Sequence, residues 1–231
     1  FWNGGSGTGE YRRVYHYARR RLRRTVRRRS SVSAPDVADH AREWFRSTSG
    51  PRFLLMHLMD PHEPYYPGLK RWLDVGPLRA RRALAQFSED RLAMTDAQRA
   101  TIERLYRGCV EFVDAHVRSL LSFVPDDALV VVVGDHGEEF LDHGHLAHYP
   151  KLYDELVRVP FIVDHPGAPT RRESAPVPLR DVPPTVCDAL DVEPPAAFAG
   201  ESLLPTVTEA VDPERAPVTS LALRGDSVTS Q

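Results

Sequence analysis

The stretch that decides the fold runs Val130-Val-Val-Val-Gly-Asp-His-Gly-Glu-Glu-Phe-Leu-Asp-His-Gly-His-Leu-Ala-His148. It opens with a β-branched apolar run that ends at Gly134, a pattern typical of a strand buried on both faces. Acidic and histidine side chains follow at once. Because ligands bind beyond the carboxyl ends of strands in an open α/β sheet, the sequence predicts a site at this edge.

The polar side chains of this stretch suit a divalent metal and an anionic substrate, since both carboxylates and imidazoles are present. They are Asp135, His136, Glu138, Glu139, Asp142, His143, His145 and His148. The alternative is a solvated polar loop. Four histidines within thirteen residues make that alternative the weaker one.

A metal site is predicted at Asp135 and His136, because Gly134 and Gly137 give the backbone the freedom to turn both side chains toward one ion. Two ligands do not complete a site, so others must come from elsewhere. A separate zinc cluster over residues 143–148 is disfavoured, because His-x-His-x-x-His matches no common structural zinc spacing.

A second buried strand is predicted over residues 53–59, followed by the proline-rich loop Asp60-Pro-His-Glu-Pro-Tyr-Tyr-Pro67. If the two strands are parallel neighbours, their loops open on the same edge of the sheet. His62 and His148 would then contact the anion or donate a proton to a leaving oxygen.

Helices alternate with these strands. Ser33-Ala-Pro-Asp36 predicts a helix start with Ser33 as its cap, and the helix stops before Gly50. Thr95-Asp-Ala-Gln98 resembles a capping box at the start of a long helix that reaches Val124. Its predicted apolar face holds Ile102, Leu105, Tyr106, Cys109, Val110, Val113, Val117, Leu120, Leu121 and Val124.

A further strand over residues 159–163, a proline-initiated helix over 182–190 and an ordered loop over 194–205 around Gly200 continue the alternation. Together these elements predict an α/β fold with a mostly parallel central sheet flanked by helices.

The composition is ordinary for a soluble protein, with 42% hydrophobic and 27% charged residues. No apolar run approaches the roughly 18 residues that a membrane span needs, and residues 1–5 do not resemble a signal peptide. We therefore expect a cytoplasmic location by default. Cys109 and Cys187 lie in apolar patterns, and we expect thiols rather than a disulfide.

Charge is distributed unevenly along the chain. The first 29 residues hold ten arginines and one acid, whereas the rest holds 20 basic and 31 acidic residues. We predict two parts: residues 1–32, a glycine-rich start with an Arg-rich helix, and residues 33–231, an α/β domain. The helix could bind a polyanion or pair with acids elsewhere in the protein. We expect no nucleic-acid partner.

Several motifs, in this order, resemble the sulfatase family of the alkaline phosphatase superfamily. They are Met59-Asp-Pro-His-Glu-Pro-Tyr65, Gly134-Asp-His-Gly-Glu-Glu139, His143-Gly144, Leu152-Tyr-Asp-Glu-Leu-Val-Arg-Val-Pro-Phe-Ile162, Asp181-Val-Pro-Pro-Thr-Val186 and Phe198-Ala-Gly-Glu-Ser-Leu-Leu-Pro205. The resemblance covers about residues 36–205. It implies an alkaline-phosphatase-like fold, here expected to be incomplete at both ends.

The resemblance also implies a hydrolase of sulfate or phosphate esters with a divalent metal, Ca²⁺ first and Mn²⁺, Mg²⁺ or Zn²⁺ as alternatives. By matching position, Asp135 and His136 are expected to be metal ligands. His62 matches the histidine that contacts the transferred group, and His148 falls near the residue that binds that group after the metal loop. His143 is expected among the substrate-binding residues, and Arg158 is expected to order its loop through backbone carbonyls.

One expected part of the family pattern does not occur in these 231 residues. Family members carry a nucleophile in Cys/Ser-x-Pro-x-Arg, or a Thr or Ser in phosphate-transferring relatives. Neither Cys109 nor Cys187 lies in that signature. We therefore expect the chain to carry the C-terminal half of an active site and to be inactive alone. A phosphodiesterase or phosphotransferase, and a non-catalytic remnant that binds polyanions, remain as alternatives.

Overall fold

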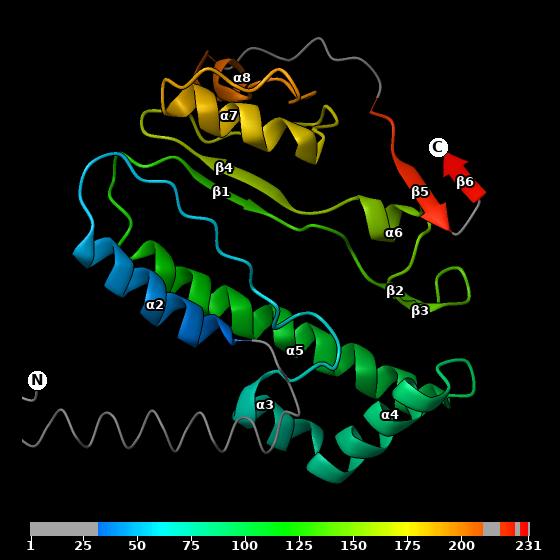
Figure 1. The fold of residues 1–231 in the computed structure, drawn as a ribbon. Helices are drawn as coiled ribbons and strands as arrows, with labels where there is room; N and C mark the ends of the chain where they lie inside the picture. The colour runs from blue at the N-terminus through cyan, green and yellow to red at the C-terminus, as the bar shows by residue number, and fades with distance from the viewer. Residues whose placement is uncertain (1–31, 210–217, 225–226, 231) are drawn as a thin grey trace, which may run out of the picture. The chain divides into compact units, whose positions relative to one another are not determined.

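A computed structural model describes residues 32–209, 218–224 and 227–230 (Figure 1). The chain divides into two compact units. Unit 1 comprises Phe1–Thr48, Leu54–Glu89 and Met94–Leu120, and unit 2 comprises Ser49–Phe53, Asp90–Ala93 and Leu121–Gln231. The predicted Arg-rich helix lies outside the described residues, and the predicted division at residue 32 remains a prediction.

The described part of unit 1 is helical. Its helices are α2 (Ala34–Ser47), α3 (Gly68–Val75), α4 (Pro77–Glu89) and α5 (Asp96–Leu121). Unit 2 contains short strands and helices. They are β1 (Val130–Val133), β2 (Glu139–Phe140), β3 (Leu146–Ala147), α6 (Asp154–Val157), β4 (Phe161–Asp164), a 3₁₀ turn at Leu179–Asp181, α7 (Val182–Ala189), α8 (Leu204–Glu209), β5 (Leu221–Arg224) and β6 (Ser227–Ser230).

The capping box predicted for the long helix is confirmed at the start of α5. The Gln98 side chain accepts a hydrogen bond from the Thr95 backbone N–H at 2.8 Å, and the Thr95 hydroxyl accepts one from the Gln98 N–H at 3.3 Å. These reciprocal bonds satisfy two donors that a helix start otherwise leaves open. Ile102, Leu105 and Cys109 of the predicted apolar face are fully buried.

The loop over residues 60–67 packs against α4 and α5. Tyr65 is fully buried, and its ring lies 5.7 Å from that of Phe87 and 5.6 Å from that of Tyr106. On α5, a Cβ at Gly108 would lie 2.7 Å from the Cβ of Pro67. The predicted proline-rich loop is therefore held by close packing on two helices rather than by its prolines alone.

The start of α2 differs from the prediction that the Ser33 hydroxyl would cap it. Ser33 occupies the cap position, but its hydroxyl donates to the Asp36 carboxylate at 2.7 Å. The Ala34 backbone N–H instead donates to Asp60 Oδ2 at 2.6 Å. Asp60 is fully buried, so a carboxylate from the 60–67 loop supplies the acceptor and complements the helix dipole.

The prediction of a mostly parallel sheet is wrong for the described residues. They form three two-stranded sheets, β1–β4, β2–β3 and β5–β6, and each pair is antiparallel. The architecture is mixed helix and sheet with a small sheet content (Figure 1). The alternation of strands and helices did not reveal that Val130 pairs with Asp164 in reverse direction.

Two strand predictions also need correction. Residues 53–59 form no strand, although their exposure alternates as in an extended chain; Phe53 is 59% and Leu55 80% exposed. β1 is not buried on both faces, since its residues are half-buried and Val133 is exposed. An apolar run becomes a buried strand only where neighbouring strands and covering layers exist, and β1 pairs with β4 alone among the described residues.

The turn after β1 packs backbone to backbone against α6. The Gly137 N–H donates to the Leu156 carbonyl at 2.8 Å. A Cβ at Gly137 would lie 1.9 Å from the Glu155 carbonyl oxygen, a distance that no side chain tolerates. Glycine is therefore required at position 137 so that the backbone of the turn can lie against the backbone of α6. Sequence reasoning assigned it only a role in turning the chain.

The ordered loop predicted around Gly200 is confirmed. The buried Asp181 side chain accepts a hydrogen bond from the Glu201 N–H at 3.1 Å. The Thr185 hydroxyl on α7 accepts one from the Leu203 N–H at 2.9 Å and donates to the Asp181 carbonyl at 2.6 Å. Buried polar groups of the 3₁₀ turn and of α7 therefore fix the loop that leads into α8.

Both cysteines are free thiols, with Cys109 buried and Cys187 half-buried. Among the helices that the structure describes, none is both long and apolar enough to cross a bilayer.

Core packing on α5 makes a first prediction. Leu105 is fully buried whereas Leu121, on the same helix, is 44% exposed. We expect Leu105→Ala to lower the free energy of unfolding by about 2–5 kcal/mol through lost burial and an unfilled cavity. The matched Leu121→Ala change should cost less than about 1 kcal/mol. Urea unfolding followed by circular dichroism measures both, and equal losses would show that the packing around Leu105 is not as described.

The close approach at Gly137 makes a second prediction. We expect Gly137→Ala to lower the free energy of unfolding by about 3 kcal/mol, because the backbone of α6 must move to admit a methyl group. Gly134→Ala is the control: the nearest atoms to its Cβ would be side-chain atoms of Val159 at 3.2 and 3.4 Å and of Pro160 at 3.5 Å, which can shift slightly, rather than backbone. Should the two variants unfold at the same urea concentration, the Gly137–α6 contact would be refuted.

Candidate active site

The turn that carries Asp135 and His136 is anchored at both ends within unit 2. The Gly134 N–H donates to the Pro160 carbonyl at 3.1 Å, and the Gly137 N–H donates to the Leu156 carbonyl. The two side chains between these anchors remain accessible, with 68% exposure for Asp135 and 39% for His136. The backbone is therefore fixed while the two polar groups stay open to solvent.

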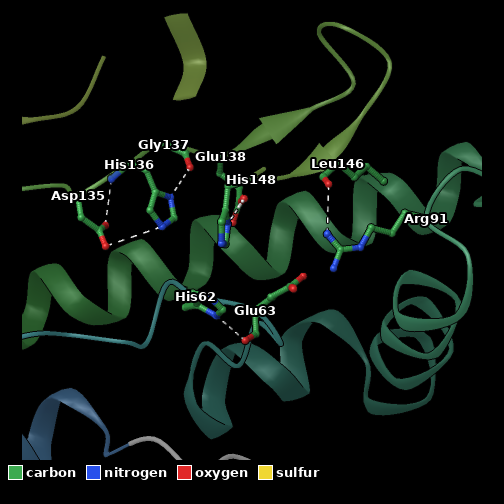
Figure 2. Close-up of polar contacts among 9 residues, drawn as sticks. All are labelled: His62, Glu63, Arg91, Asp135, His136, Gly137, Glu138, Leu146 and His148. Atoms are coloured by element: carbon green, nitrogen blue, oxygen red, sulfur yellow. Dashed lines mark hydrogen bonds and ion pairs between the residues drawn. The ribbon is translucent and has the colours of Figure 1, made fainter. Parts of the chain in front are cut away.

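The His136 ring is oriented by its own loop. Its Nδ1 lies 2.9 Å from the Gly137 carbonyl oxygen (Figure 2). Because a carbonyl only accepts, Nδ1 must carry the proton, and Nε2 is then the basic nitrogen of the neutral ring. That Nε2 lies 3.8 Å from Asp135 Oδ2, while Asp135 Oδ1 accepts the His136 backbone N–H at 3.0 Å.

This arrangement fits two ligands of a divalent metal. Ligand atoms on one ion at about 2.1 Å stand roughly 3–3.5 Å apart, so small side-chain rotations bring Asp135 Oδ2 and His136 Nε2 into range. The backbone carbonyl that holds Nδ1 also supplies the outer hydrogen bond that metal-binding histidines usually make. The predicted pair thus has suitable geometry, although two ligands are not a complete site.

His148 lies against His136. The two ring centroids are 4.1 Å apart with 35° between the ring planes. Glu138 holds His148 from the other direction: its Oε1 lies 3.0 Å from His148 Nδ1, and its side chain is only 4% exposed (Figure 2). The carboxylate therefore orients the imidazole and fixes the proton on Nδ1.

The register of the β2–β3 hairpin explains why Glu138 and His148 meet. Glu139 pairs with Ala147 and Phe140 with Leu146, so Glu138 and His148 occupy the next opposed positions. Arg91 supports the hairpin by donating from Nη1 to the Leu146 carbonyl at 3.3 Å (Figure 2). Sequence reasoning named Glu138 among the polar side chains of this stretch but did not pair it with His148, because it did not predict this hairpin.

His143 is engaged by different residues. Its Nδ1 lies 2.5 Å from Glu155 Oε1, and its ring stacks on Tyr153 with centroids 3.6 Å apart and 4° between planes. Nearby, the buried Glu139 carboxylate accepts the backbone N–H groups of His143 and His145 at 3.0 and 2.8 Å. His143 therefore belongs to the hairpin turn and its contact with α6.

His62, predicted to contact the transferred group, belongs to unit 1. Its Nδ1 lies 2.8 Å from the Glu63 carbonyl oxygen, so this ring too carries its proton on Nδ1 (Figure 2). That His62 joins the unit 2 residues in one site stays a prediction. Arg158, predicted to bond backbone carbonyls, has its side chain 3.4 Å from the Asp154 carboxylate and largely exposed.

Sequence reasoning missed the carboxylates that position the histidines. Glu138 holds His148, Glu139 holds the hairpin turn, and Glu155 holds His143. A hairpin prediction from Gly144, whose φ is 85°, would have placed Glu138 opposite His148. Glu155 carried no comparable signal, because its contact depends on how α6 packs.

Comparison with known proteins places these residues in a family. The chain matches the sulfatase family over residues 6–192, a span that begins before the predicted division at residue 32. It is 36% identical over 87 residues to the Delta 4,5-hexuronate-2-O-sulfatase of Bacteroides thetaiotaomicron, covering 35% of this chain and 18% of that protein. It is 31% identical over 104 residues to the uncharacterized sulfatase YidJ of Escherichia coli, covering 43% and 21% respectively.

Solved structures agree on the fold. The phosphonate monoester hydrolase SpPMH from Silicibacter pomeroyi aligns with a TM-score of 0.51 and 27% identity, over 71% of this chain and 35% of that one. BT4656, solved in complex with its substrate D-glucosamine-2-N,6-O-disulfate, aligns with a TM-score of 0.52 and 24% identity, over 63% and 32%. The chain thus spans about a fifth of these curated relatives and about a third of these structures.

The family match covers most of the chain, and it includes the loop in which Asp135, His136 and His148 lie together. The resemblance inferred from the sequence motifs is confirmed, and the small, antiparallel sheet content does not conflict with it. The chain belongs to the sulfatase family.

Proposed function

We propose that the chain takes part in metal-dependent hydrolysis of sulfate esters and contributes one portion of the active site. The observation that carries the proposal is the cluster of Asp135, His136 and His148, in which each ring is held by a hydrogen bond at Nδ1. Such preorganisation is what a site needs when catalysis depends on positioning and on stabilising charge. Membership in the sulfatase family supports the reaction class.

Asp135 Oδ2 and His136 Nε2 would hold the divalent cation, with Ca²⁺ as our first choice and Mn²⁺, Mg²⁺ or Zn²⁺ as alternatives. A cation bound there would act as a Lewis acid on an oxygen of the transferred group. The Gly137 carbonyl keeps the His136 ring turned so that Nε2 is presented. Asp135 also uses its second oxygen to hold the turn, which limits the rotation that ion binding would require.

His148 would handle the substrate. With Nδ1 bonded to Glu138, its Nε2 is the nitrogen that acts on the leaving or transferred oxygen. Donation of a proton from Nε2 needs the cationic ring, and the adjacent carboxylate of Glu138 offsets that charge. His62 is proposed as a second contact to the transferred group. His143 is left out of this proposal, because Glu155 and Tyr153 already engage its ring.

A second candidate function is hydrolysis or transfer of phosphoryl-type esters by the same residues. The similarity to a phosphonate monoester hydrolase favours it, at 27% identity over 71% of this chain. Both reactions build negative charge on the oxygens of a tetrahedral group, and Asp135, His136 and His148 suit either. Rates with matched aryl sulfate and aryl phosphate substrates distinguish the two functions.

The sequence contains no Cys/Ser-x-Pro-x-Arg nucleophile signature, which makes a third prediction. We expect the purified 231-residue chain to show no turnover of aryl sulfate or aryl phosphate esters with Ca²⁺ or Mn²⁺. We also expect it to bind these ions more weakly than about 1 μM, because two ligands leave an ion mostly solvated. Metal-dependent turnover, or submicromolar affinity for Ca²⁺ or Mn²⁺ by calorimetry, would contradict the proposal that this chain carries only one portion of the active site.

The ligand assignment makes a fourth prediction, for an active polypeptide that contains these residues together with a nucleophile segment. We expect Asp135→Ala to lower kcat/KM at least 10³-fold through loss of bound metal, as estimated from the several kcal/mol such an ion supplies. Asp142→Ala is the matched control: among the described residues, this exposed carboxylate accepts one long bond, at 3.4 Å, from the Phe140 N–H. Normal metal content and turnover in Asp135→Ala would refute the assignment.

A further inference from the structure

A second group of potential metal ligands lies beside the candidate active site and shares no residue with it. Within the part of the chain that the structure describes, one atom each of Glu139, His143 and Glu155 lie within 4.8 Å of one another. Glu139 and His143 belong to the β2–β3 hairpin and Glu155 to α6. All three lie in unit 2. Clustered acidic groups are common on protein surfaces, so the grouping alone carries no conclusion.

The second observation is the state of Glu139. Its side chain is fully buried, and its Oε1 accepts the N–H groups of His143 and His145. Its other oxygen, Oε2, is buried without a hydrogen-bond partner among the described residues. A buried carboxylate oxygen with no partner is costly, and an ion is one of the few features that satisfies it. The carboxylate already has its backbone bonds, so Oε2 is the oxygen left to serve a cation.

The other two side chains are held where a cation could use them. His143 stacks flat on Tyr153, which fixes the plane of the imidazole, and its Nδ1 lies 2.5 Å from Glu155 Oε1. Glu155 is 22% exposed, so the group opens to solvent on one side while Glu139 closes the other. An ion could therefore enter past Glu155, and water could complete its coordination.

We propose that Glu139, His143 and Glu155 form a binding site for a borderline divalent cation, with Zn²⁺ as the best fit. One imidazole and two carboxylates match zinc better than calcium, which prefers an all-oxygen shell. Ligand atoms on one tetrahedral zinc stand about 3.4 Å apart, so a group already within 4.8 Å needs only small side-chain movements. The nitrogen and oxygen of His143 and Glu155, now hydrogen-bonded directly to each other, would separate to admit the ion.

The site would strengthen the connection between two segments that already touch through backbone atoms and through the side chains of His143 and Glu155. The Gly137 N–H bonds the Leu156 carbonyl just before the hairpin, and a cation would add a side-chain link from the hairpin turn to α6. Because binding at a site formed only on folding stabilises the folded chain, zinc should raise the unfolding temperature. The inference does not depend on the proposed hydrolysis, because it uses none of the proposed catalytic residues.

The test uses the whole 231-residue chain and Zn²⁺ as the probe. We expect isothermal titration calorimetry to show one Zn²⁺ bound per chain with a dissociation constant of about 1 μM or below, and thermal unfolding to shift upward by several degrees. Glu155→Gln should weaken binding at least about 10-fold, since one charged ligand is lost. Glu139→Gln should do the same while its amide oxygen still accepts the two backbone N–H groups.

Asp135→Asn is the control that separates this site from the candidate active site. It should leave the tight Zn²⁺ event and the thermal shift unchanged, whatever becomes of the hydrolase proposal. If tight binding persists in both Glu139→Gln and Glu155→Gln but disappears in Asp135→Asn, the ion lies in the β1 loop and the proposal is wrong. Absence of any tight event in the unmodified chain also overturns it. Because Glu155 is half-buried at the solvent side of the group rather than in the core, Glu155→Gln decides the question even if Glu139→Gln misfolds.

Discussion

The register of the β2–β3 hairpin is the constraint on which the candidate site depends. Pairing Glu139 with Ala147 sets Glu138 opposite His148, and a shift of one residue would send every one of these side chains to the other face. Only two residue pairs form the ladder, so other bonds must hold the register. The buried Glu139 carboxylate does so by accepting two N–H groups across the turn, and Leu141 N–H adds a bond to the His145 carbonyl at 2.7 Å. The hydrogen bonds to the buried Glu139 carboxylate thus stabilise a register that the short strands alone would not fix.

Backbone contacts, together with the side-chain contacts of His143 with Glu155 and Tyr153, connect that hairpin and the turn before it with the rest of unit 2. Gly137 approaches α6 so closely that its N–H reaches the Leu156 carbonyl, and Gly134 is tied to Pro160 in the same way. The turn that bears Asp135 and His136 therefore has two fixed ends, while its side chains remain exposed. Because the backbone beneath these polar groups is already fixed, less conformational entropy is lost when a ligand binds. The glycines serve close approach here as much as flexibility.

Local signals in the sequence were sufficient where the structure is decided locally. The Thr95–Gln98 capping box and the loop around Gly200 follow from spacing and motif. Non-local pairing was not predictable in the same way. Residues 53–59 are an apolar run like β1, interrupted only by His57, yet they form no strand, because a strand needs a hydrogen-bonded partner strand and the sequence does not identify one. The positioning roles of the carboxylates Glu138, Glu139 and Glu155 were missed for the same reason, since their partners depend on hairpin register and on the packing of α6.

The Asp60 carboxylate at the start of α2 links two segments that are 26 residues apart in sequence. Asp60 directly precedes Pro61 and His62, so the loop that carries His62 and the first turn of α2 share one buried hydrogen bond. A shift of the backbone in either segment would therefore also shift the other segment. A substitution near Ala34 that tilts the helix would move the backbone before His62, although Ala34 itself has no proposed contact with a substrate. Natural variation at residues 33–36 should therefore be coupled to variation in the 60–67 loop, and a catalytic effect there would not imply a catalytic residue.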